Sequence, residues 1–180
     1  MPPNLKGIER QKSIENVVFK KVEKNEKTEK EVMDLLHEYP AQFIHGVFED
    51  YAENDFKNSS VFIAYDADIA IGCLMYISET KECNWLAVKK DTVFPRREIA
   101  RQLFESVYET IPPGEEIYFY VNTEDSSMPG YDKLGESFET ARKIYKSWGW
   151  EMKEENRIND YYGPGAHVYK VTWIPNPLKN

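Results

Sequence analysis

Three β-rich runs follow one another in the middle of the chain, at residues 61–66, 69–78 and 83–88. Their content of β-branched, aromatic and other large apolar residues is typical of strands buried in a sheet. The first two runs are separated only by a short turn rich in Asp, which predicts a β-hairpin. The apolar faces of such a sheet have to be covered by other elements of the chain.

Amphipathic patterns on both sides of these runs supply the helices. Apolar residues recur at helical spacing over four segments, at residues 29–39, 41–56, 96–109 and 136–148. A capping box formed by Thr28 and Glu31 predicts the start of the first helix. Further strands are predicted at residues 17–22, 116–121, 150–154 and 167–173. This order predicts an α+β fold in which a mixed sheet of about six to seven strands is flanked by about four helices.

The chain is long enough for one hydrophobic core. It has 180 residues, of which 41% are hydrophobic, and this length is near that of one compact domain. Residues 1–15 are polar and lack periodicity. We therefore expect a loosely ordered lead-in over residues 1–15, followed by a single domain over residues 16–180.

The charge of the chain limits its partners. A formal net charge of −8 and a pI near 5.0 argue against nucleic acid, because binding to a phosphate backbone needs a basic surface. An acidic surface favours cationic partners such as amines. The predicted second helix carries four acidic residues, Glu49, Asp50, Glu53 and Asp55. They could attract a polyamine, an aminoglycoside or a basic peptide end, or could simply form the solvated face of the helix.

The sequence offers no membrane or metal signal. The N-terminus lacks an apolar stretch, and Asp66 and Asp68 interrupt the most apolar part of the chain, so we expect a cytoplasmic protein that does not enter a membrane. Cys73 and Cys83 are too few for a disulfide framework. Since no Cys/His spacing resembles a zinc site, we expect no metal.

Several catalytic motifs are missing from the sequence. It contains no GxxxxGK[ST] or GxGxxG phosphate loop, no HExxH zinc motif and no GxSxG nucleophile motif. The segment 83–109 instead reads as a strand, a loop and a helix. In that arrangement the free amides and the dipole at the helix N-terminus can bind an anion such as a pyrophosphate.

One segment near the C-terminus carries a family resemblance. Ala141, Tyr145, Gly149 and Trp150 stand as A-x-x-x-Y-x-x-x-G-W. This resembles the A-x-x-x-Y-x-x-x-G-F segment of the GCN5-related N-acetyltransferases, and the strand around Gly72 and the run CNWLAV are similar to the third and fourth strands of that family. The resemblance covers about residues 17–173, and it implies a domain that uses acetyl-CoA as cosubstrate.

The predicted cofactor loop departs from the family pattern [QR]-x-x-G-x-[GA]. The best alignment places residues 95–100, PRREIA, on it, so that Glu98 stands where the family has a glycine. A carboxylate there would repel a phosphate. Arg96, Arg97 and Arg101 could supply the pyrophosphate contacts while Glu98 turns outward, or binding of the cofactor could be weak or lost. Phe138 also replaces an Asn that the family often has.

The resemblance implies roles for individual residues. Tyr145 would protonate the departing thiolate of coenzyme A, and Glu82 would act as the base for the attacking amine, although His45 and Glu49 are alternatives. The cofactor contacts implied in this way are Leu86, Ala87, Val88, Arg96, Arg97, Ile99, Ala100, Arg101 and Ala141.

Two functions follow from the resemblance. The first is direct transfer of an acetyl group from acetyl-CoA to a primary amine of a small molecule or peptide, by a chain that could pair as a homodimer. The alternative is a non-catalytic protein of the same fold that binds an acyl-CoA or a partner protein.

Overall fold

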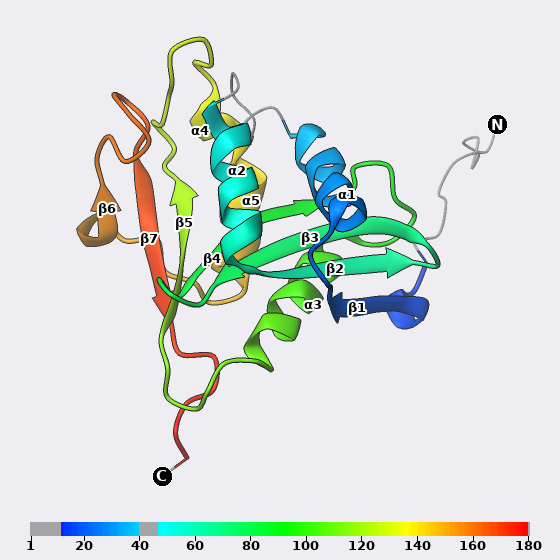
Figure 1. Cartoon of the computed structure of the whole chain (residues 1–180). Coiled ribbons are helices and arrows are strands. Elements are labelled where there is room, and N and C mark those ends of the chain that lie inside the picture. The colour runs from blue at the N-terminus through cyan, green and yellow to red at the C-terminus, as the bar shows by residue number, and fades with distance from the viewer. Residues whose placement is uncertain (1–11, 40–46, 180) are drawn as a thin grey trace, which may run out of the picture.

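The computed structural model describes residues 12–39 and 47–179, and its centre is a seven-stranded mixed sheet (Figure 1). The strands lie in the order β1-β2-β3-β4-β5-β7-β6. Their bounds are β1 Val17–Lys21, β2 Ser60–Asp66, β3 Ile69–Ile77, β4 Glu82–Val88, β5 Ile117–Asn122, β6 Arg157–Ile158 and β7 Val168–Trp173. The helices are α1 Glu26–His37, α2 Val47–Asn58, α3 Arg96–Tyr108, α4 Leu134–Ser137 and α5 Glu139–Ser147.

The sheet consists of two antiparallel halves joined by one weak parallel contact. Strands β1 to β4 pair with their neighbours in antiparallel register, and so do β5, β7 and β6. Between the halves, β4 and β5 run parallel but share a single registered pair, Glu82 with Tyr118. The two strands therefore separate beyond this pair, as Figure 1 shows. Side chains of both strands line a cavity there.

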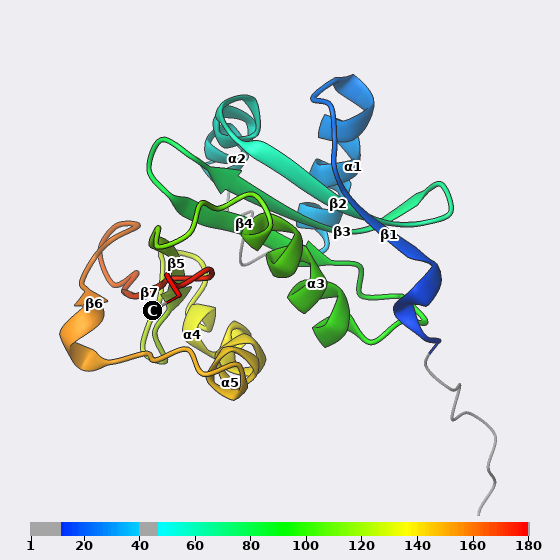
Figure 2. The same cartoon turned by 90° about the horizontal axis from the view of Figure 1, so that it is seen from below.

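Helices cover both faces of the sheet, as the view in Figure 2 makes clear. One core lies beneath α1 and α2 and contains buried residues such as Leu36, Phe56 and Ile63. The other lies beneath α3 and α5 and contains Leu103, Phe104 and Tyr145. None of the helices within the described ranges is long and apolar enough to cross a membrane.

Most predicted elements are present, with boundaries set by local chemistry. The central hairpin is formed by β2 and β3, as predicted. The capping box was placed three residues too late: the side chain of Asn25 accepts a hydrogen bond from the Thr28 amide, and the Thr28 hydroxyl accepts one from the Asn25 amide. Thr28 is thus the third residue of the first turn, and α1 begins at Glu26.

Two predictions near the C-terminus differ from the structure. The strand predicted at 150–154 is absent, because Trp150 turns into the core and Glu154–Asn156 form a short 3₁₀ turn, so that the strand follows at Arg157–Ile158. The helix predicted at 136–148 is interrupted at Phe138, which separates α4 from α5. The start predicted for the second helix, at residues 41–46, lies outside the described residues.

Gly72 of β3 permits the close packing of α3 on the sheet. A Cβ atom at this position would lie 2.9 Å from Cγ2 of Ile99 and 3.2 Å from Cδ1 of Leu103, and both of those side chains are fully buried. We expect Gly72→Ala to lower the free energy of unfolding by about 1–3 kcal/mol, because α3 has to move away from the sheet. Urea denaturation measures this loss, and an unchanged midpoint would contradict the close packing.

Candidate active site

Two cavities lie along the gap between β4 and β5. The larger has a volume of about 760 Å³ and the smaller about 370 Å³. Leu86 of β4 and Phe138, between α4 and α5, line both of them. A reaction between two bound molecules could therefore take place where these two side chains lie.

The larger cavity is built from several parts of the chain. The carboxyl end of β4, the first turns of α3 and the inner face of α5 form its walls, together with Tyr39 after α1. Of the residues that line it, those that bear on binding are Tyr39, Leu86, Ala87, Val88, Arg96, Arg97, Glu98, Ala100, Ala141 and Tyr145.

The first turn of α3 offers amide donors to this cavity. Its N-cap is Pro95, which makes no side-chain cap. The amides of Glu98 and Ile99 donate to the Pro95 carbonyl oxygen at 3.1 and 3.2 Å. The amides of Arg96 and Arg97, at the first two positions of the helix, have no acceptor within it, so this end can bind an anion.

Arginine side chains surround that anion-binding end. The Arg97 guanidinium donates to Oγ of Ser147 at the end of α5, at 2.6 Å, and so spans two walls of the cavity. Arg96 lies beside the hydroxyl of Tyr39, which donates a hydrogen bond to the carbonyl oxygen of Val88. Burial raises the pKa of Tyr39, and the charge of Arg96 opposes this shift.

Tyr145 forms the deep wall of the larger cavity. Its side chain is 5% exposed, and its ring stacks on Trp150 with centroids 4.8 Å apart and meets Phe119 edge-on at 5.5 Å. The hydroxyl makes no hydrogen bond to any residue in the described part of the chain. Burial raises the pKa of this phenol above its ordinary value, so the group stays protonated in neutral solution.

A bulge in β4 reshapes the strand between the two cavities. The register against β3 shifts so that three steps of β4, from Asn84 to Ala87, oppose two of β3. Trp85 within the bulge has a φ of 58°, a strained value for a bulky side chain. Its amide donates to Oδ1 of Asn84 and its indole Nε1 to Oδ2 of Asp55, both at 2.7 Å, and these bonds hold the bulge in place.

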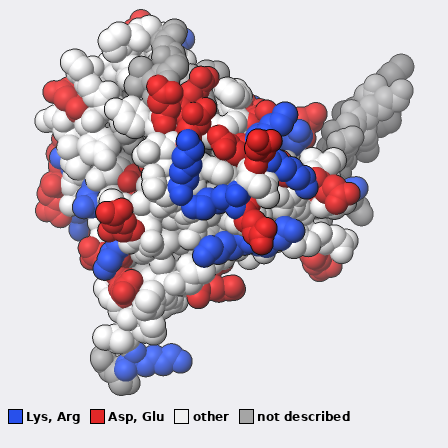
Figure 3. All heavy atoms as spheres, in the orientation of Figure 1, with Lys and Arg blue, Asp and Glu red and all other residues white. Residues whose placement is uncertain are grey.

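The smaller cavity has an acidic and aromatic lining. Its residues come from α2, β4, β5, the α4 region and the loop before β7: Tyr51, Asp55, Glu82, Asn84, Trp85, Leu86, Phe119, Tyr120, Asn122, Leu134, Phe138, Tyr161 and Tyr162. Figure 3 shows further acidic side chains over the upper part of α2. Glu49, Asp50 and Glu53 of that helix are exposed, so negative charge also lies outside the cavity.

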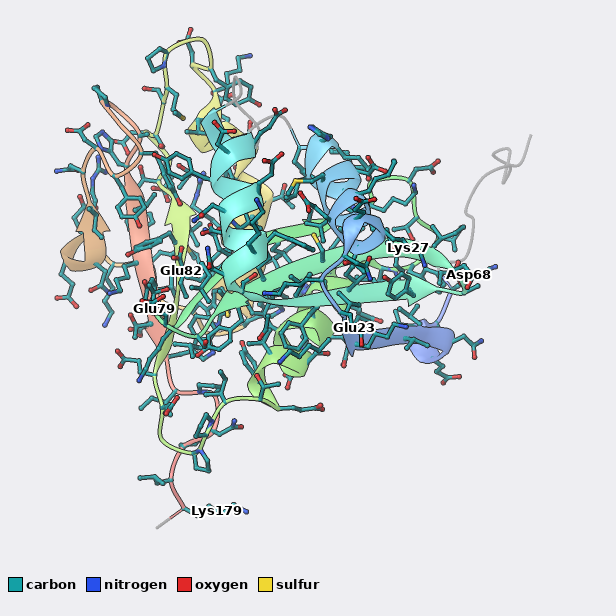
Figure 4. All side chains as sticks on the ribbon, in the orientation of Figure 1. Glu23, Lys27, Asp68, Glu79, Glu82 and Lys179 are labelled. Carbon is teal, nitrogen blue, oxygen red and sulfur yellow. The ribbon has the colours of Figure 1, made fainter. Side chains whose placement is uncertain are left out.

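Glu82 is the titratable group of this cavity whose pKa is shifted into the neutral range. It begins β4 where that strand pairs with β5 (Figure 4), and its Oε1 accepts a hydrogen bond from Nδ2 of Asn84 at 3.1 Å. Burial and the nearby Asp55 raise its pKa from 4.5 to about 7, against the opposing charge of Lys170. Such a carboxyl can take up or release a proton near neutral pH.

The structure brings most of the predicted site residues together. Eight of them line the larger cavity: Leu86, Ala87, Val88, Arg96, Arg97, Ala100, Ala141 and Tyr145. Glu82 lines the smaller one. Ile99 is instead buried in the core beneath α3, and Arg101 is an exposed residue that lines neither cavity.

Of the two alternative bases, one can be placed in the structure. His45 is outside the described residues, whereas Glu49 belongs to α2. Oε1 of Glu49 lies 3.2 Å from Nε2 of His37 on the exposed surface between α1 and α2. Glu49 lines neither cavity.

Several residues of the site could not be singled out from the sequence. Tyr39 stands at the end of the predicted first helix without a motif around it, and Asp55 is one member of a charged run. Tyr51, Tyr120 and Asn84 belong to predicted elements, but no motif marks them individually. The sequence leaves the YYGPG segment at residues 161–165 open between a simple turn and a lip of the acceptor site, and its two tyrosines line the smaller cavity.

Comparison with known proteins agrees with this architecture. The sequence matches no protein-family model, and no curated protein matches it. Among solved structures, the aminoglycoside 6'-N-acetyltransferase from Enterococcus faecium is 14% identical with a TM-score of 0.63, over 91% of this chain and 99% of that chain. An aminoglycoside 6'-N-acetyltransferase complexed with coenzyme A is 13% identical with a TM-score of 0.65, over the same shares.

A plant and a bacterial structure extend the likeness. Naa50 from Arabidopsis thaliana, in complex with the bisubstrate analogue CoA-Ac-MVNAL, is 19% identical with a TM-score of 0.60, over 88% of this chain and 98% of that chain. A putative acetyltransferase of the GNAT family from Desulfovibrio desulfuricans is 14% identical with a TM-score of 0.61, over 88% and 99%. The chain has the fold of the GCN5-related N-acetyltransferases.

Proposed function

We propose that this chain is an N-acetyltransferase that moves the acetyl group of acetyl-CoA to a primary amine by direct attack on the thioester. The observation that carries the proposal is the pair of neighbouring cavities that share Leu86 and Phe138 in their linings. A protonated phenol lines one of them and a carboxyl of raised pKa the other. Residues 16–180 would act as the unit predicted from the sequence.

The larger cavity fits acetyl-CoA by the chemistry of its walls. The amides at the start of α3 and the guanidinium groups of Arg96 and Arg97 suit a pyrophosphate. The carboxyl end of β4 offers backbone groups to a pantetheine arm, because β5 diverges from it there. A solved structure of the same fold contains coenzyme A, which supports this assignment.

The smaller cavity fits the amine. An ammonium that enters it meets Glu82, which accepts a proton and leaves a neutral nitrogen able to attack. A bond forms between this nitrogen and the thioester carbonyl carbon, and the nitrogen releases its second proton to solvent as the neutral amide forms. The carbon–sulfur bond breaks, and the electron pair leaves with sulfur. Tyr145 donates its proton to the departing thiolate and regains one from solvent.

The raised pKa of Tyr145 is compatible with this role. A buried phenol gives up a proton less readily than one in water, but a thiolate that forms beside it, away from bulk water, is destabilised for the same reason. The proton therefore moves between two groups whose anions are both disfavoured by burial.

One observation favours the alternative of a non-catalytic binding protein. Glu98 lines the larger cavity within the first turn of α3, where its carboxylate repels phosphate. The side chain is exposed, so it has room to turn toward solvent. Binding of acetyl-CoA separates the two cases.

Calorimetric titration of acetyl-CoA is the direct test. We expect a dissociation constant in the micromolar range, which Arg97→Glu raises by about tenfold to a hundredfold, because the variant replaces a charge-assisted donor with a like charge. Arg101→Glu makes the same change further along α3, at an exposed residue outside the cavity lining. It is the matched control and should change affinity by about twofold at most.

The two variants also guard against a loss of folding. Arg97 donates a hydrogen bond to Ser147, and its loss could lower stability. The thermal midpoint of each variant therefore has to be measured together with its affinity for acetyl-CoA. An equal loss of affinity in both variants would contradict a pyrophosphate site at the start of α3. Absence of any binding by the unmodified protein would rule out acetyl transfer.

A further inference from the structure

We infer that the acceptor carries a second positive charge, and that the smaller cavity takes a compact aliphatic diamine whose unreactive ammonium binds to Asp55. This inference rests on the proposed function, because it names the substrate class of the same site. Four features of the cavity support it. They are its negative charge, the hydrogen bonding of Asp55, its aromatic walls and the hydrogen bonds that its side-chain amides already make.

The cavity has more negative charge than one reacting amine needs. Asp55 and Glu82 both line it, and its described lining includes no Lys or Arg. The cation whose charge acts on Glu82, Lys170 of β7, lies outside the lining with its Nζ 4.3 Å from the centre of the Tyr118 ring. Two carboxylates in one cavity repel each other, and a second cation between them relieves that repulsion.

Asp55 is held in position by one hydrogen bond, and its second carboxylate oxygen can accept another. It projects from α2, is half-buried, and its Oδ2 accepts the indole hydrogen bond of Trp85. Oδ1 has no hydrogen bond to a residue within the described ranges. A fixed carboxylate with an available oxygen is suited to an ammonium group.

Aromatic rings form much of the remaining wall. Tyr120 and Tyr161 lie with ring centroids 4.4 Å apart, and Tyr161 meets Tyr162 edge-on at 4.7 Å. Tyr51 of α2 lines the same cavity. Ring faces attract cations and pack well against methylene groups, so these walls suit an alkyl chain that ends in ammonium.

The side-chain amides that line the cavity already make hydrogen bonds within the protein. Asn84 donates through Nδ2 to Glu82 and accepts through Oδ1 from the Trp85 amide. Oδ1 of Asn122 accepts from Oγ of Ser126 at 3.1 Å. A sugar or a peptide backbone would need such groups for its own hydroxyls or amides, whereas an alkyl chain does not. A volume of about 370 Å³ is ample for a short diamine.

Three linear four-carbon acceptors whose far ends are positive, neutral and negative test the inference. These are 1,4-diaminobutane, 1-aminobutane and 4-aminobutanoate, measured at about pH 8 with acetyl-CoA in excess. We expect kcat/KM to fall in that order, with about tenfold or more between the first two. Values within about threefold of each other, or a preference for 1-aminobutane, would overturn the inference.

A variant assigns the preference to Asp55. Asp55→Asn should reduce the ratio of kcat/KM for 1,4-diaminobutane to that for 1-aminobutane by about tenfold, because only the diamine uses this charge. Glu53→Gln removes a charge from the same helix at an exposed position outside the cavity lining, and should leave the ratio unchanged. An Asp55→Asn ratio equal to that of the unmodified protein would refute the assignment.

The failure of this inference can be told apart from that of the proposed function. If all three amines are acetylated at similar rates, the proposed acetyltransferase activity stands. Only the inference that the acceptor carries a second positive charge is then rejected. If none of them is acetylated, titration of 1,4-diaminobutane into the protein decides the matter, and absence of binding contradicts the inference. Absence of acetyl-CoA binding would reject the proposed function instead.

Discussion

Replacement of Glu82 by Gln should stop amine acetylation while making the folded protein more stable. The carboxyl is the proposed proton acceptor, and Gln cannot take its place, so we expect kcat to fall by about a hundredfold or more. Burial raises the pKa of Glu82 because the charged form is costly in its cavity. Gln fills the same space without that charge.

The effect on stability depends on pH. The pKa of Glu82 is about 7 in the folded chain and 4.5 as its ordinary value, so the folded state favours the protonated carboxyl. Its contribution to stability is fully present below the ordinary pKa and is lost as pH rises through about 7. At about pH 8 the carboxylate costs on the order of 3 kcal/mol, and Glu82→Gln should recover much of this. At about pH 4 the two proteins should differ little.

Urea denaturation at both pH values, with Glu79→Gln as the control, measures this difference. Glu79 lies exposed in the turn between β3 and β4 (Figure 4), so its replacement removes one charge outside the cavity. A stability gain that is the same at both pH values would contradict the raised pKa. Normal turnover in the Glu82→Gln variant would contradict the role as base.

The pH profile of the unmodified protein follows from the same group. We expect kcat/KM for the amine to fall about tenfold per pH unit below about 7, because Glu82 becomes protonated. Asp55 from α2, Lys170 from β7 and the tyrosines Tyr118, Tyr120, Tyr161 and Tyr162 are the ionisable groups around it. A profile that stays flat between about pH 5 and 8 would count against Glu82.

Tyr145→Phe is the second large effect. The variant keeps the ring that packs on Trp150 and Phe119 and removes only the hydroxyl, which has no hydrogen bond to a described residue. We expect kcat to fall by about a hundredfold or more while the affinity for coenzyme A and the thermal midpoint stay close to their original values. Steady-state kinetics, calorimetry and thermal denaturation measure the three quantities.

Tyr108→Phe serves as the control for this loss of a hydroxyl. Tyr108 is a partly buried tyrosine at the end of α3 that lines neither cavity, so its replacement should leave kcat unchanged. Undiminished turnover in Tyr145→Phe would show that another group protonates the thiolate. Loss of coenzyme A affinity together with turnover would indicate a binding role instead.

Patterns within short segments were sufficient for much of the fold. The β2–β3 hairpin and the helix that carries Tyr145 follow from periodicity and turn residues, since both depend on contacts close in sequence. The start of α1 was misplaced because Asn25 and Thr28 are both good N-cap residues three positions apart, and the sequence pattern alone does not rank them.

Contacts between distant segments account for what could not be predicted. Asp55 enters the cavity because Trp85 adopts a left-handed conformation and donates to it across 30 positions of sequence. Tyr161 reaches Tyr120 only through the pairing of β7 with β5. Neither the bulge in β4 nor the separation of β4 from β5 leaves a periodic signal, so the cavities that depend on them were not visible in the sequence.

The single registered pair between β4 and β5 also affects how the molecule assembles and responds to ligands. Strands β1 to β4 pair within one half of the chain and β5 to β7 within the other, so each half can form its own ladder before the two join. Neither half contains a complete cavity, because Leu86 and Phe138 come from different halves. A molecule that binds where the halves meet contacts both of them. It would therefore stabilise the association of the two halves more than either half alone.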